Sequence, residues 1–214
     1  MNDRIGRRGL CLVLAAPSGA GKSTIARALL AREWALQASV SATTRAMRPG
    51  ERPGVDYHFL NPSEFQALIG ADALLEWAEV FGRRYGTPRA PVEAALSGGR
   101  DVIFDIDWQG WRSVKAALPD DAVGVFIMPP SLAALRTRLE GRAGDSTEEI
   151  ERRMALALAE IGHWAEFDHI VVNSDLERCV AEVQAVLHAA RCRVGRLTGM
   201  TDFVAQLLPG AGPN

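Results

Sequence analysis

The chain has 214 residues, of which 48% are hydrophobic and 23% charged, a composition that is ordinary for a globular protein of one domain with appendages, or of two small lobes. The formal net charge of −2 argues against bulk nucleic-acid binding, and no apolar run approaches membrane-spanning length. Three widely spaced cysteines without metal-ligand spacing indicate reduced thiols, so we expect a cytoplasmic protein with neither a nucleic-acid nor a membrane partner.

Strand and helix patterns alternate along most of the chain. β-like runs are expected at 9–16, 101–106, 122–128 and 168–173, and helices over 22–33, 109–118, 131–140, 147–166, 175–194 and, as a short piece, 200–208. This alternation predicts a parallel sheet covered by helices on both faces, with ligands bound at the carboxyl ends of its strands. Of the five tryptophans, Trp34, Trp108 and Trp111 are expected in the core.

The first strand leads directly into the stretch APSGAGKST at residues 16–24. It satisfies the phosphate-binding pattern G-x-x-x-x-G-K-[ST] except at the first position, which is Ala16. Backbone N–H groups of such a loop wrap a polyphosphate, together with the positive end of the following helix and the lysine ammonium. Gly19 and Gly21 lie inside the wrap, whereas residue 16 only leaves the strand and tolerates a methyl group. The alternative is a glycine-rich turn that merely packs a helix on a sheet.

Lysine is used sparingly in this chain. Of its 24 basic residues only Lys22 and Lys115 are lysines, and the others are arginines. A lysine is needed where a slim ammonium must fit between phosphates, because the planar fork of arginine does not fit there equivalently. The position of Lys22 therefore favours a phosphate-binding loop.

Residues 38–98 break the alternation and predict an inserted lobe rich in Pro, Gly and polar residues. Within it, Arg45 and Arg48 lie three residues apart beside hydroxyl groups, which suits a clamp on a small phosphate dianion. Tyr57 and Tyr85 are the only two tyrosines and could add O–H donors. A solvated arginine-rich loop is the alternative.

Two carboxylates, Glu76 and Asp107, are expected close to otherwise apolar surroundings. Guanine offers adjacent donors at N1 and the exocyclic N2, and adenine does not offer that arrangement. A buried carboxylate left unpaired costs about 1–3 kcal/mol or more, which is enough for strong discrimination between bases. A guanine site could therefore be built from these residues, although composition alone does not prove one.

The order and spacing of these motifs resemble those of the bacterial guanylate kinases over about residues 9–195. The segments that carry the resemblance are APSGAGKST, SVSATTRAMRPGE, YHF, LLEWAEVFG, YGT, DIDWQG, RLEGR and IVVN. The resemblance implies the α/β P-loop nucleoside-monophosphate kinase fold, with a parallel sheet core flanked by helices, an inserted GMP-binding lobe and a helical lid. It implies that MgATP phosphorylates GMP, and dGMP similarly. The implied divisions are a P-loop core (1–37, 99–135 and 155–195), a GMP-binding lobe (38–98), a lid (136–154) and a C-terminal tail (196–214).

The resemblance also implies roles for individual residues. The implied ATP site comprises Ala16, Pro17, Ser18, Gly19, Ala20, Gly21, Lys22, Ser23, Thr24 and Asn173. The implied GMP site comprises Arg45, Arg48, Tyr57 and Tyr85 at the phosphate and Ser41, Glu76, Thr87 and Asp107 at the guanine. The implied catalytic residues are Lys22, Arg45, Arg138, Arg142 and Arg153. Mg²⁺ is the implied cofactor, with Ser23 and Asp105 as its partners, and the oligomeric state is open between monomer and homodimer.

The chain departs from the family pattern in three places. Besides Ala16, Arg84 stands where an aromatic residue often precedes Tyr-Gly-Thr, and Ala143 stands where glycine is frequent, which leaves the flexibility of the lid open. The alternatives are a related kinase acting on a sugar phosphate and a non-catalytic guanylate-kinase-like binding module. The guanine-reading set disfavours the former, and the intact Lys22 and Ser23 disfavour the latter. A GTPase is excluded because neither lysine belongs to an N-K-x-D motif.

Overall fold

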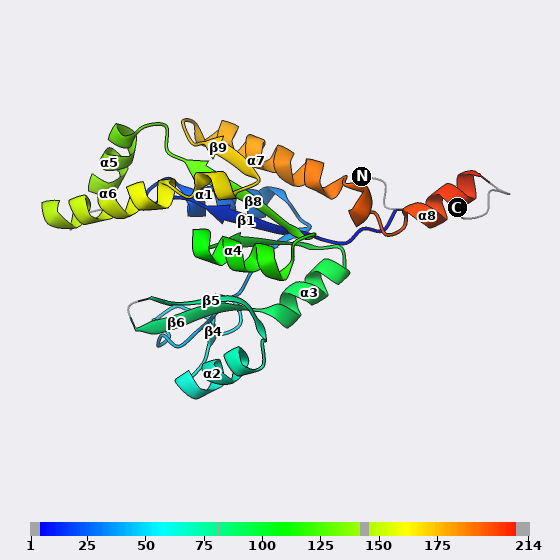
Figure 1. Ribbon diagram of the computed structural model, residues 1–214, viewed down its shortest axis with the longest axis horizontal. Helices are drawn as coiled ribbons and strands as arrows, with labels where there is room; N and C mark the ends of the chain where they lie inside the picture. The colour runs from blue at the N-terminus through cyan, green and yellow to red at the C-terminus, as the bar shows by residue number, and fades with distance from the viewer. Residues whose placement is uncertain (1–4, 81, 142–145, 209–214) are drawn as a thin grey trace.

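The computed structural model describes residues 5–80, 82–141 and 146–208, arranged around two sheets (Figure 1). The larger sheet has five parallel strands in the order β2-β7-β1-β8-β9. Its strands are β1 (Cys11–Ala15), β2 (Leu36–Ala38), β7 (Asp101–Asp105), β8 (Ala122–Met128) and β9 (His169–Val172). The predicted parallel α/β core is therefore confirmed, and β2 is a strand that the sequence analysis did not predict.

Helices cover both faces of this sheet because its strands are apolar on both sides. On β1, Leu12 and Leu14 pack in one core cluster with residues of α1 and α7, while Cys11 and Val13 pack in a second cluster with residues of α3 and α4. The covering helices are α1 (Lys22–Arg32), α7 (Leu176–Arg191), α3 (Arg89–Ser97) and α4 (Trp108–Ala117). Figure 1 shows α5 (Leu132–Glu140) and α6 (Thr147–Ile161) together at one end of the molecule.

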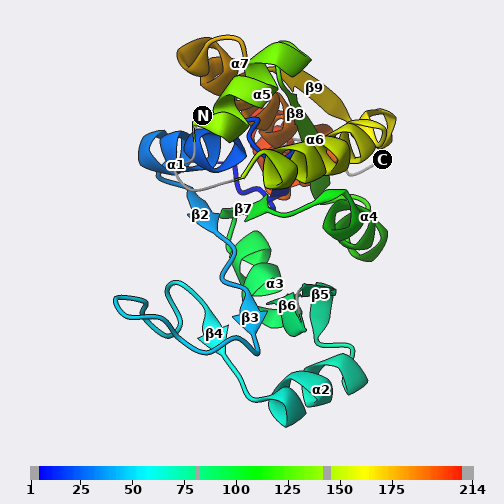
Figure 2. The same ribbon diagram turned by 90° about the vertical axis from the view of Figure 1, so that its left-hand side faces the viewer.

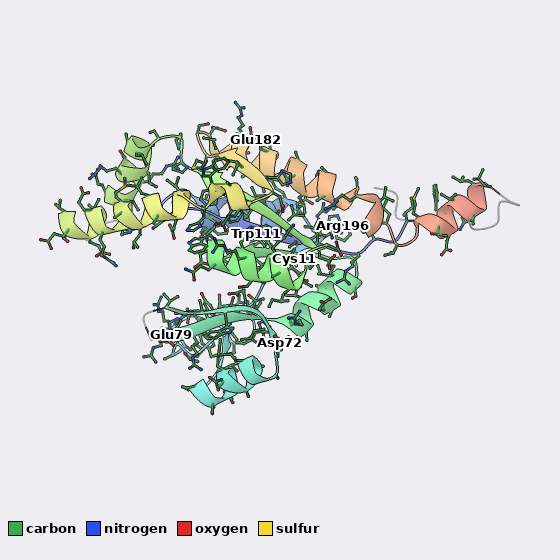
Figure 3. All side chains as sticks on the ribbon, in the orientation of Figure 1. Cys11, Asp72, Glu79, Trp111, Glu182 and Arg196 are labelled. Carbon is green, nitrogen blue, oxygen red and sulfur yellow. The ribbon has the colours of Figure 1, made fainter. Side chains whose placement is uncertain are left out.

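The tryptophans differ in environment. Trp111 is buried beside the sheet (Figure 3), where its ring lies so close to Gly124 that a Cβ at that glycine would be 2.6 Å from Cζ2. Trp108 is only partly buried, on the first turn of α4. Trp34 is 94% exposed, so its predicted place in the core is wrong. Trp34 lies in the turn between α1 and β2. It is therefore not on the face of α1 that packs on the sheet.

The second sheet lies in the inserted segment and has the order β4-β3-β6-β5. Its elements are β3 (Ala42–Thr43), β4 (His58–Phe59), α2 (Pro62–Gly70), β5 (Leu74–Val80) and β6 (Arg83–Pro88). Ala42, Phe65 and Leu74 form its own small core. Figure 2 shows this sheet and α2 on the side of the larger sheet that carries α3 and α4.

The two sheets are joined by α3, which follows β6 directly. Val92, Ala95 and Leu96 of this helix pack in the core cluster of α4 and β7, although they lie within residues 38–98. The chain therefore leaves the core after β2, forms the smaller sheet, and returns to the core through α3, which is itself part of it.

The C-terminal third follows the expected order with two differences. α6 ends at Ile161 and is followed by a 3-10 turn, η1 (Trp164–Glu166), where one helix to residue 166 was expected. After α7, η2 (Val194–Arg196) brings Arg196 into the interior, where it donates to the Gly9 carbonyl at 2.9 Å and pairs with Asp121 at 3.2 Å (Figure 3). α8 (Met200–Leu207) matches the predicted short helix. None of the helices in the described ranges is long and apolar enough to cross a lipid bilayer.

Candidate functional site

The loop between β1 and α1 has the backbone that its sequence predicts. Gly19 and Gly21 have φ angles of +89° and +97°, in the left-handed region that glycine adopts at no steric cost. Ala16 is not among the described residues with positive φ, and it packs against the core cluster of α1 and α7. The loop therefore needs glycine at 19 and 21 but not at 16.

A methyl group at residue 21 is expected to destabilise the protein. The added Cβ would lie 2.5 Å from Asn173 Nδ2, and a left-handed backbone alone costs an alanine about 1–2 kcal/mol. We expect Gly21→Ala to lower the melting temperature, measured by calorimetry. Gly195→Ala is the matched control, because a Cβ there meets nothing within 4 Å. Equal melting temperatures for the two variants would contradict the expectation.

Lys22, Ser23 and Asp105 form one contact group at the start of α1 and the end of β7. Lys22 Nζ donates to the Ile106 carbonyl at 2.8 Å and lies 2.8 Å from Asp105 Oδ1. The Ser23 hydroxyl donates to Asp105 Oδ2 at 2.7 Å. This proximity follows from the register of the parallel strands, which pairs Leu14 with Asp105 just before the loop. The predicted lysine and both predicted cation partners are thus brought together.

Three further side chains hold the loop from the other side. Asn173 is 6% exposed and donates from Nδ2 to the Ala20 carbonyl at 2.8 Å. Arg138 of α5 donates to the carbonyls of Asn173 at 3.0 Å and Ala20 at 3.4 Å. Arg153 of α6 donates to the Ser18 hydroxyl at 3.2 Å. Two of the three arginines predicted to be catalytic in the expected lid, Arg138 and Arg153, therefore contact the loop, while the predicted Arg142 and the departure at Ala143 lie outside the described residues.

A carboxylate that the sequence analysis did not single out also contacts the loop. The Ser18 N–H donates to Glu160 Oε2 at 3.1 Å. Burial raises the pKa of Glu160, and the Ser18 N–H and the Lys22 ammonium oppose that rise. A contact between residues 142 positions apart leaves no local sequence signal.

A cavity of about 290 Å³ separates the loop side from the smaller sheet. Ser23 and Asp105 line it together with Ser41 and Tyr57 from the inserted segment. Arg27 of α1 also lines it, with its Nε donating to the Ser23 carbonyl at 3.2 Å. The predicted cation partners and part of the predicted acceptor site therefore face the same space.

The predicted phosphate clamp is preformed around a carboxylate. Two guanidinium nitrogens of Arg45 bind Glu51 at 2.6 and 3.1 Å, and the guanidinium lies 5.2 Å from the centre of the Tyr57 ring. The Glu51 hydrogen bond raises the pKa of Arg45, and Arg45 lowers the pKa of Glu51. Tyr57 and Tyr85 meet edge to face with ring centres 6.1 Å apart.

Arg48 differs from Arg45 in the contacts of its guanidinium. Its backbone N–H donates to Glu51 at 2.7 Å, so one carboxylate organises both arginines. Over the ranges that the structure describes, the Arg48 guanidinium makes no hydrogen bond or ion pair. Glu51 is a second residue that the sequence analysis did not single out. Of the two arginines of the predicted clamp, Arg45 is thus paired and Arg48 is available within the described ranges.

The predicted base-reading residues lie on β5, β6 and the start of α4. Glu76 and Thr87 face each other in the register of β5 and β6, and the Thr87 hydroxyl donates to Glu76 Oε1 at 2.6 Å. Glu76 is half-buried, and burial raises its pKa, with a smaller contribution from Asp107. Asp107 itself is exposed and accepts from the Gly110 N–H at 2.8 Å as the N-cap of α4. The expected apolar surroundings are therefore wrong for Asp107, because helix capping keeps it at the surface.

The raised pKa of Glu76 predicts a pH dependence for any ligand that donates hydrogen bonds to it. The carboxylate accepts from two donors when ionised and loses that capacity as the pH falls through its pKa. Burial raises that pKa. As the pH is lowered, kcat/KM for such a ligand is therefore expected to begin falling at a higher pH than it would with a glutamate of ordinary pKa. Steady-state profiles between pH 4 and 8 measure this limb, and the limb should be absent in Glu76→Gln. An identical limb in the variant would contradict the assignment.

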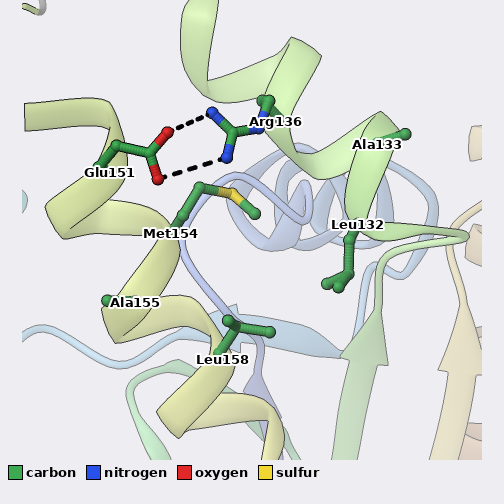
Figure 4. A pocket seen from close by; sticks show the side chains of 7 residues that line it. All are labelled: Leu132, Ala133, Arg136, Glu151, Met154, Ala155 and Leu158. Atoms are coloured by element: carbon green, nitrogen blue, oxygen red, sulfur yellow. Dashed lines mark hydrogen bonds and ion pairs between the residues drawn. The ribbon is translucent and has the colours of Figure 1, made fainter. Parts of the chain in front are cut away.

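Away from the loop, an apolar groove lies between the two helices that carry Arg138 and Arg153. Met154 and Leu158 of α6, together with Leu132 and Ala133 of α5, line a cavity of about 460 Å³ (Figure 4). Arg136 and Glu151 close one side with an ion pair at 2.6 Å. The groove holds none of the predicted site residues.

The paired carboxylate and hydroxyl oxygens of Asp105 and Ser23 are hard donors of the kind that Mg²⁺ prefers. Both side chains are exposed and both line the 290 Å³ cavity. Within the described part of the chain, no group of three or more His, Cys, Asp or Glu residues could hold a metal ion. Two protein oxygens completed by water and phosphate oxygens are the usual arrangement for Mg²⁺, so these residues fit it.

Comparison with known proteins gives one consistent result. A family model described as Guanylate kinase matches residues 8–190. A guanylate kinase of Gluconobacter oxydans is 59% identical over 199 residues, which cover 93% of this chain and 96% of the relative. One of Rhodospirillum rubrum is 54% identical over 208 residues, covering 97% and 95%.

The fold is matched by a solved structure as well. The crystal structure of guanylate kinase from Anaplasma phagocytophilum superposes with a TM-score of 0.75 at 33% identity. The match covers 95% of this chain and 97% of that one. Sequence and structure thus resemble the same group of proteins over nearly the whole chain.

Proposed function

The chain belongs to the guanylate kinase family, and we propose that the cavity between the P-loop and the smaller sheet is where its two substrates meet. The protein is an ATP:GMP phosphotransferase, which transfers the γ-phosphate of ATP to GMP and yields ADP and GDP. The observation that supports the location is the shared cavity lining of Ser23 and Asp105 with Ser41 and Tyr57.

ATP binds at the P-loop in this proposal. The backbone N–H groups of residues 18–24 and the positive end of α1 receive its phosphates, and the Lys22 ammonium reaches the phosphates being transferred. Asn173, which contacts the Ala20 carbonyl, lies near the adenine. Lys22 exchanges its present contacts with Ile106 and Asp105 for phosphate oxygens.

GMP binds between the smaller sheet and the start of α4. Arg45, Arg48, Tyr57 and Tyr85 hold its phosphate, and the available guanidinium of Arg48 gives a dianion its first partner. The guanine-reading residues are Ser41, Glu76, Thr87 and Asp107. These groups contact base and phosphate rather than sugar, so we propose dGMP as a second acceptor.

The chemistry requires positioning and charge more than covalent catalysis. A GMP phosphate oxygen is already nucleophilic, so no general base is needed. The acceptor clamp holds that oxygen in line, while Lys22, Arg138 and Arg153 neutralise charge on the transferred group. Arg45 contributes from the acceptor side, and Arg142 keeps the same proposed role from outside the described residues. Closure of residues 136–154 when both nucleotides are bound excludes water.

Mg²⁺ is the proposed cofactor, held by Asp105 and Ser23 directly or through water. When bound, it supplies positive charge to the phosphates. The hydrogen bond from Ser23 to Asp105 keeps the two oxygens together at the loop. Removal of divalent cations with a chelator is expected to abolish turnover without unfolding the protein.

We also propose a division of the chain into units, a cellular compartment and the binding partners. The core (1–37, 99–135 and 155–195), the GMP-binding lobe (38–98), the lid (136–154) and the tail (196–214) are the proposed units. Cys11, Cys179 and Cys192 are free thiols, in keeping with a reducing cytoplasm. Small-molecule nucleotides are the proposed partners.

The test is a coupled ADP-release assay with MgATP that compares GMP, dGMP, AMP, UMP and ribose 5-phosphate as acceptors. Fast turnover with GMP and dGMP, and little with the others, is expected. Fast turnover with ribose 5-phosphate would instead indicate a sugar-phosphate kinase. Hydrolysis of ATP without an acceptor, as fast as GDP formation, would contradict the proposed gating by the lid.

A further inference from the structure

Glu160 occupies the last turn of α6 and contacts the P-loop, yet the proposed reaction gives it no role. Its Oε2 accepts the Ser18 N–H at 3.1 Å. Within the described ranges, no arginine or lysine forms an ion pair with this carboxylate. Its specific contact is therefore a hydrogen bond from the loop backbone rather than a charge pair.

Arg153 contacts the same serine from the same helix. Its Nη2 donates to the Ser18 hydroxyl at 3.2 Å, and Glu160 follows seven residues later. Seven residues span about two turns of an α-helix, so the two side chains lie on one face. Two residues on one face of α6 thus bind Ser18: Glu160 binds its backbone N–H and Arg153 binds its hydroxyl.

The end of α6 that carries Glu160 is also fixed to the core on a second side. Immediately after the helix, the His163 ring stacks on Trp108 of α4 with centres 3.6 Å apart. Glu166 then binds Arg112 of α4 through two bonds of 2.6 Å. By contrast, residues 147 and 148 at the other end of α6 are exposed. The helix therefore has an anchored end, from which Arg153 is two turns away.

We propose that Glu160 is a positioning residue for Arg153: by holding the C-terminal end of α6 on the Ser18 N–H, it sets where the Arg153 guanidinium meets the ATP phosphates. This inference rests on the proposed function of Arg153. It predicts that kcat depends on how far the acceptor oxygen of residue 160 extends from the helix and does not depend on the charge of that side chain. The raised pKa of Glu160 agrees with a site that does not favour the charged form.

Two conservative variants separate reach from charge. Glu160→Gln keeps a carbonyl acceptor at the same reach and removes the charge, whereas Glu160→Asp keeps the charge and withdraws the oxygen by one methylene. We expect Glu160→Asp to lower kcat about ten-fold with KM for GMP unchanged, and Glu160→Gln to stay within about three-fold of the parent. Glu148→Asp is the matched control on the same helix and is expected to match the parent. The opposite order of the two variants, or full activity of Glu160→Asp, would overturn the proposal.

A double-mutant cycle tests whether Glu160 acts through Arg153. In an Arg153→Ala background, Glu160→Asp is expected to lower kcat by less than about two-fold further. If the ten-fold loss persists there, Glu160 acts on the loop alone and the proposal fails. Turnover of GMP by the parental enzyme in the same assay tests the proposed function separately, and melting temperatures show that each variant is folded.

Discussion

Replacing Lys22 with arginine is expected to lower kcat for GDP formation by about a hundred- to a thousand-fold, the loss typical of one charge-stabilising donor. The variant keeps the positive charge, so the loss comes from shape. Lys22 Nζ lies 2.8 Å from both the Ile106 carbonyl and Asp105 Oδ1, a place for a compact ammonium. A planar guanidinium is wider and presents its donors in a fixed fork. It therefore cannot take the same place between the loop and the phosphates.

The other lysine of the chain supplies the control. Lys115 lies 3.4 Å from Asp168 and over the ring of Trp111, contacts that an arginine also makes. Lys115→Arg is expected to keep kcat and KM for ATP within about two-fold of the parent, since it touches none of the site residues. Steady-state kinetics with both substrates varied measure the two variants. More than a tenth of parental kcat in Lys22→Arg would refute the role given to the ammonium.

Replacing Glu76 with glutamine is expected to lower kcat/KM for GMP about a hundred-fold while leaving KM for ATP unchanged. The half-buried carboxylate has two acceptor oxygens and already takes one hydrogen bond, from Thr87 at 2.6 Å. Glutamine turns one of those acceptors into a donor, which faces the N–H groups of guanine. A hydrogen bond to a charged group contributes about 1.5–3 kcal/mol, and a mismatched donor adds to that loss. The preference for GMP over AMP is expected to shrink accordingly.

A neighbouring carboxylate on the same strand gives the matched control. Glu79 is exposed and lies 3.9 Å from Arg84, on the part of β5 beyond Glu76 (Figure 3). Glu79→Gln is expected to retain parental kinetics with both nucleotides. Unchanged discrimination between GMP and AMP in Glu76→Gln would remove Glu76 from the guanine site.

The core was predictable because its signals are local. β1, β7 and β8 are runs of largely apolar residues that the fold buries on both faces, and the P-loop follows the first of them without interruption. β2 has only the three residues Leu36–Ala38, too few to show a period. Its pairing with β7 depends on the whole sheet.

Two helices of the inserted segment were hidden by residues that usually indicate loops. α2 begins with Asn61, Pro62 and a reciprocal bond between Asn61 and Glu64, which is a capping box with proline at the first helical position. α3 contains Pro91 in its first turn, where proline is tolerated because that N–H has no helical partner. Both signals were present in the sequence and were outweighed by the surrounding Pro, Gly and polar residues.

The site was predictable only where its residues are contiguous or belong to a recognisable motif. Glu51 and Glu160 were missed because they act on other protein groups, the arginine clamp and the Ser18 backbone, rather than through a pattern of their own. The surroundings of Asp107 were misjudged for a related reason. Apolar neighbours in sequence do not bury a residue that begins a helix at the edge of a sheet.

The ion pair between Arg45 and Glu51 has a consequence for which anions the enzyme captures. An incoming phosphate meets a guanidinium that is already neutralised, so it exchanges one ion pair for another and gains little from the encounter. In the proposed function, a free inorganic phosphate gains only the Arg48 guanidinium in addition, whereas a nucleotide also brings a base for Glu76 and Thr87. At the proposed acceptor site, the Glu51 carboxylate is thus an internal competitor for Arg45, so a small anion gains less there than it would from an unpaired guanidinium.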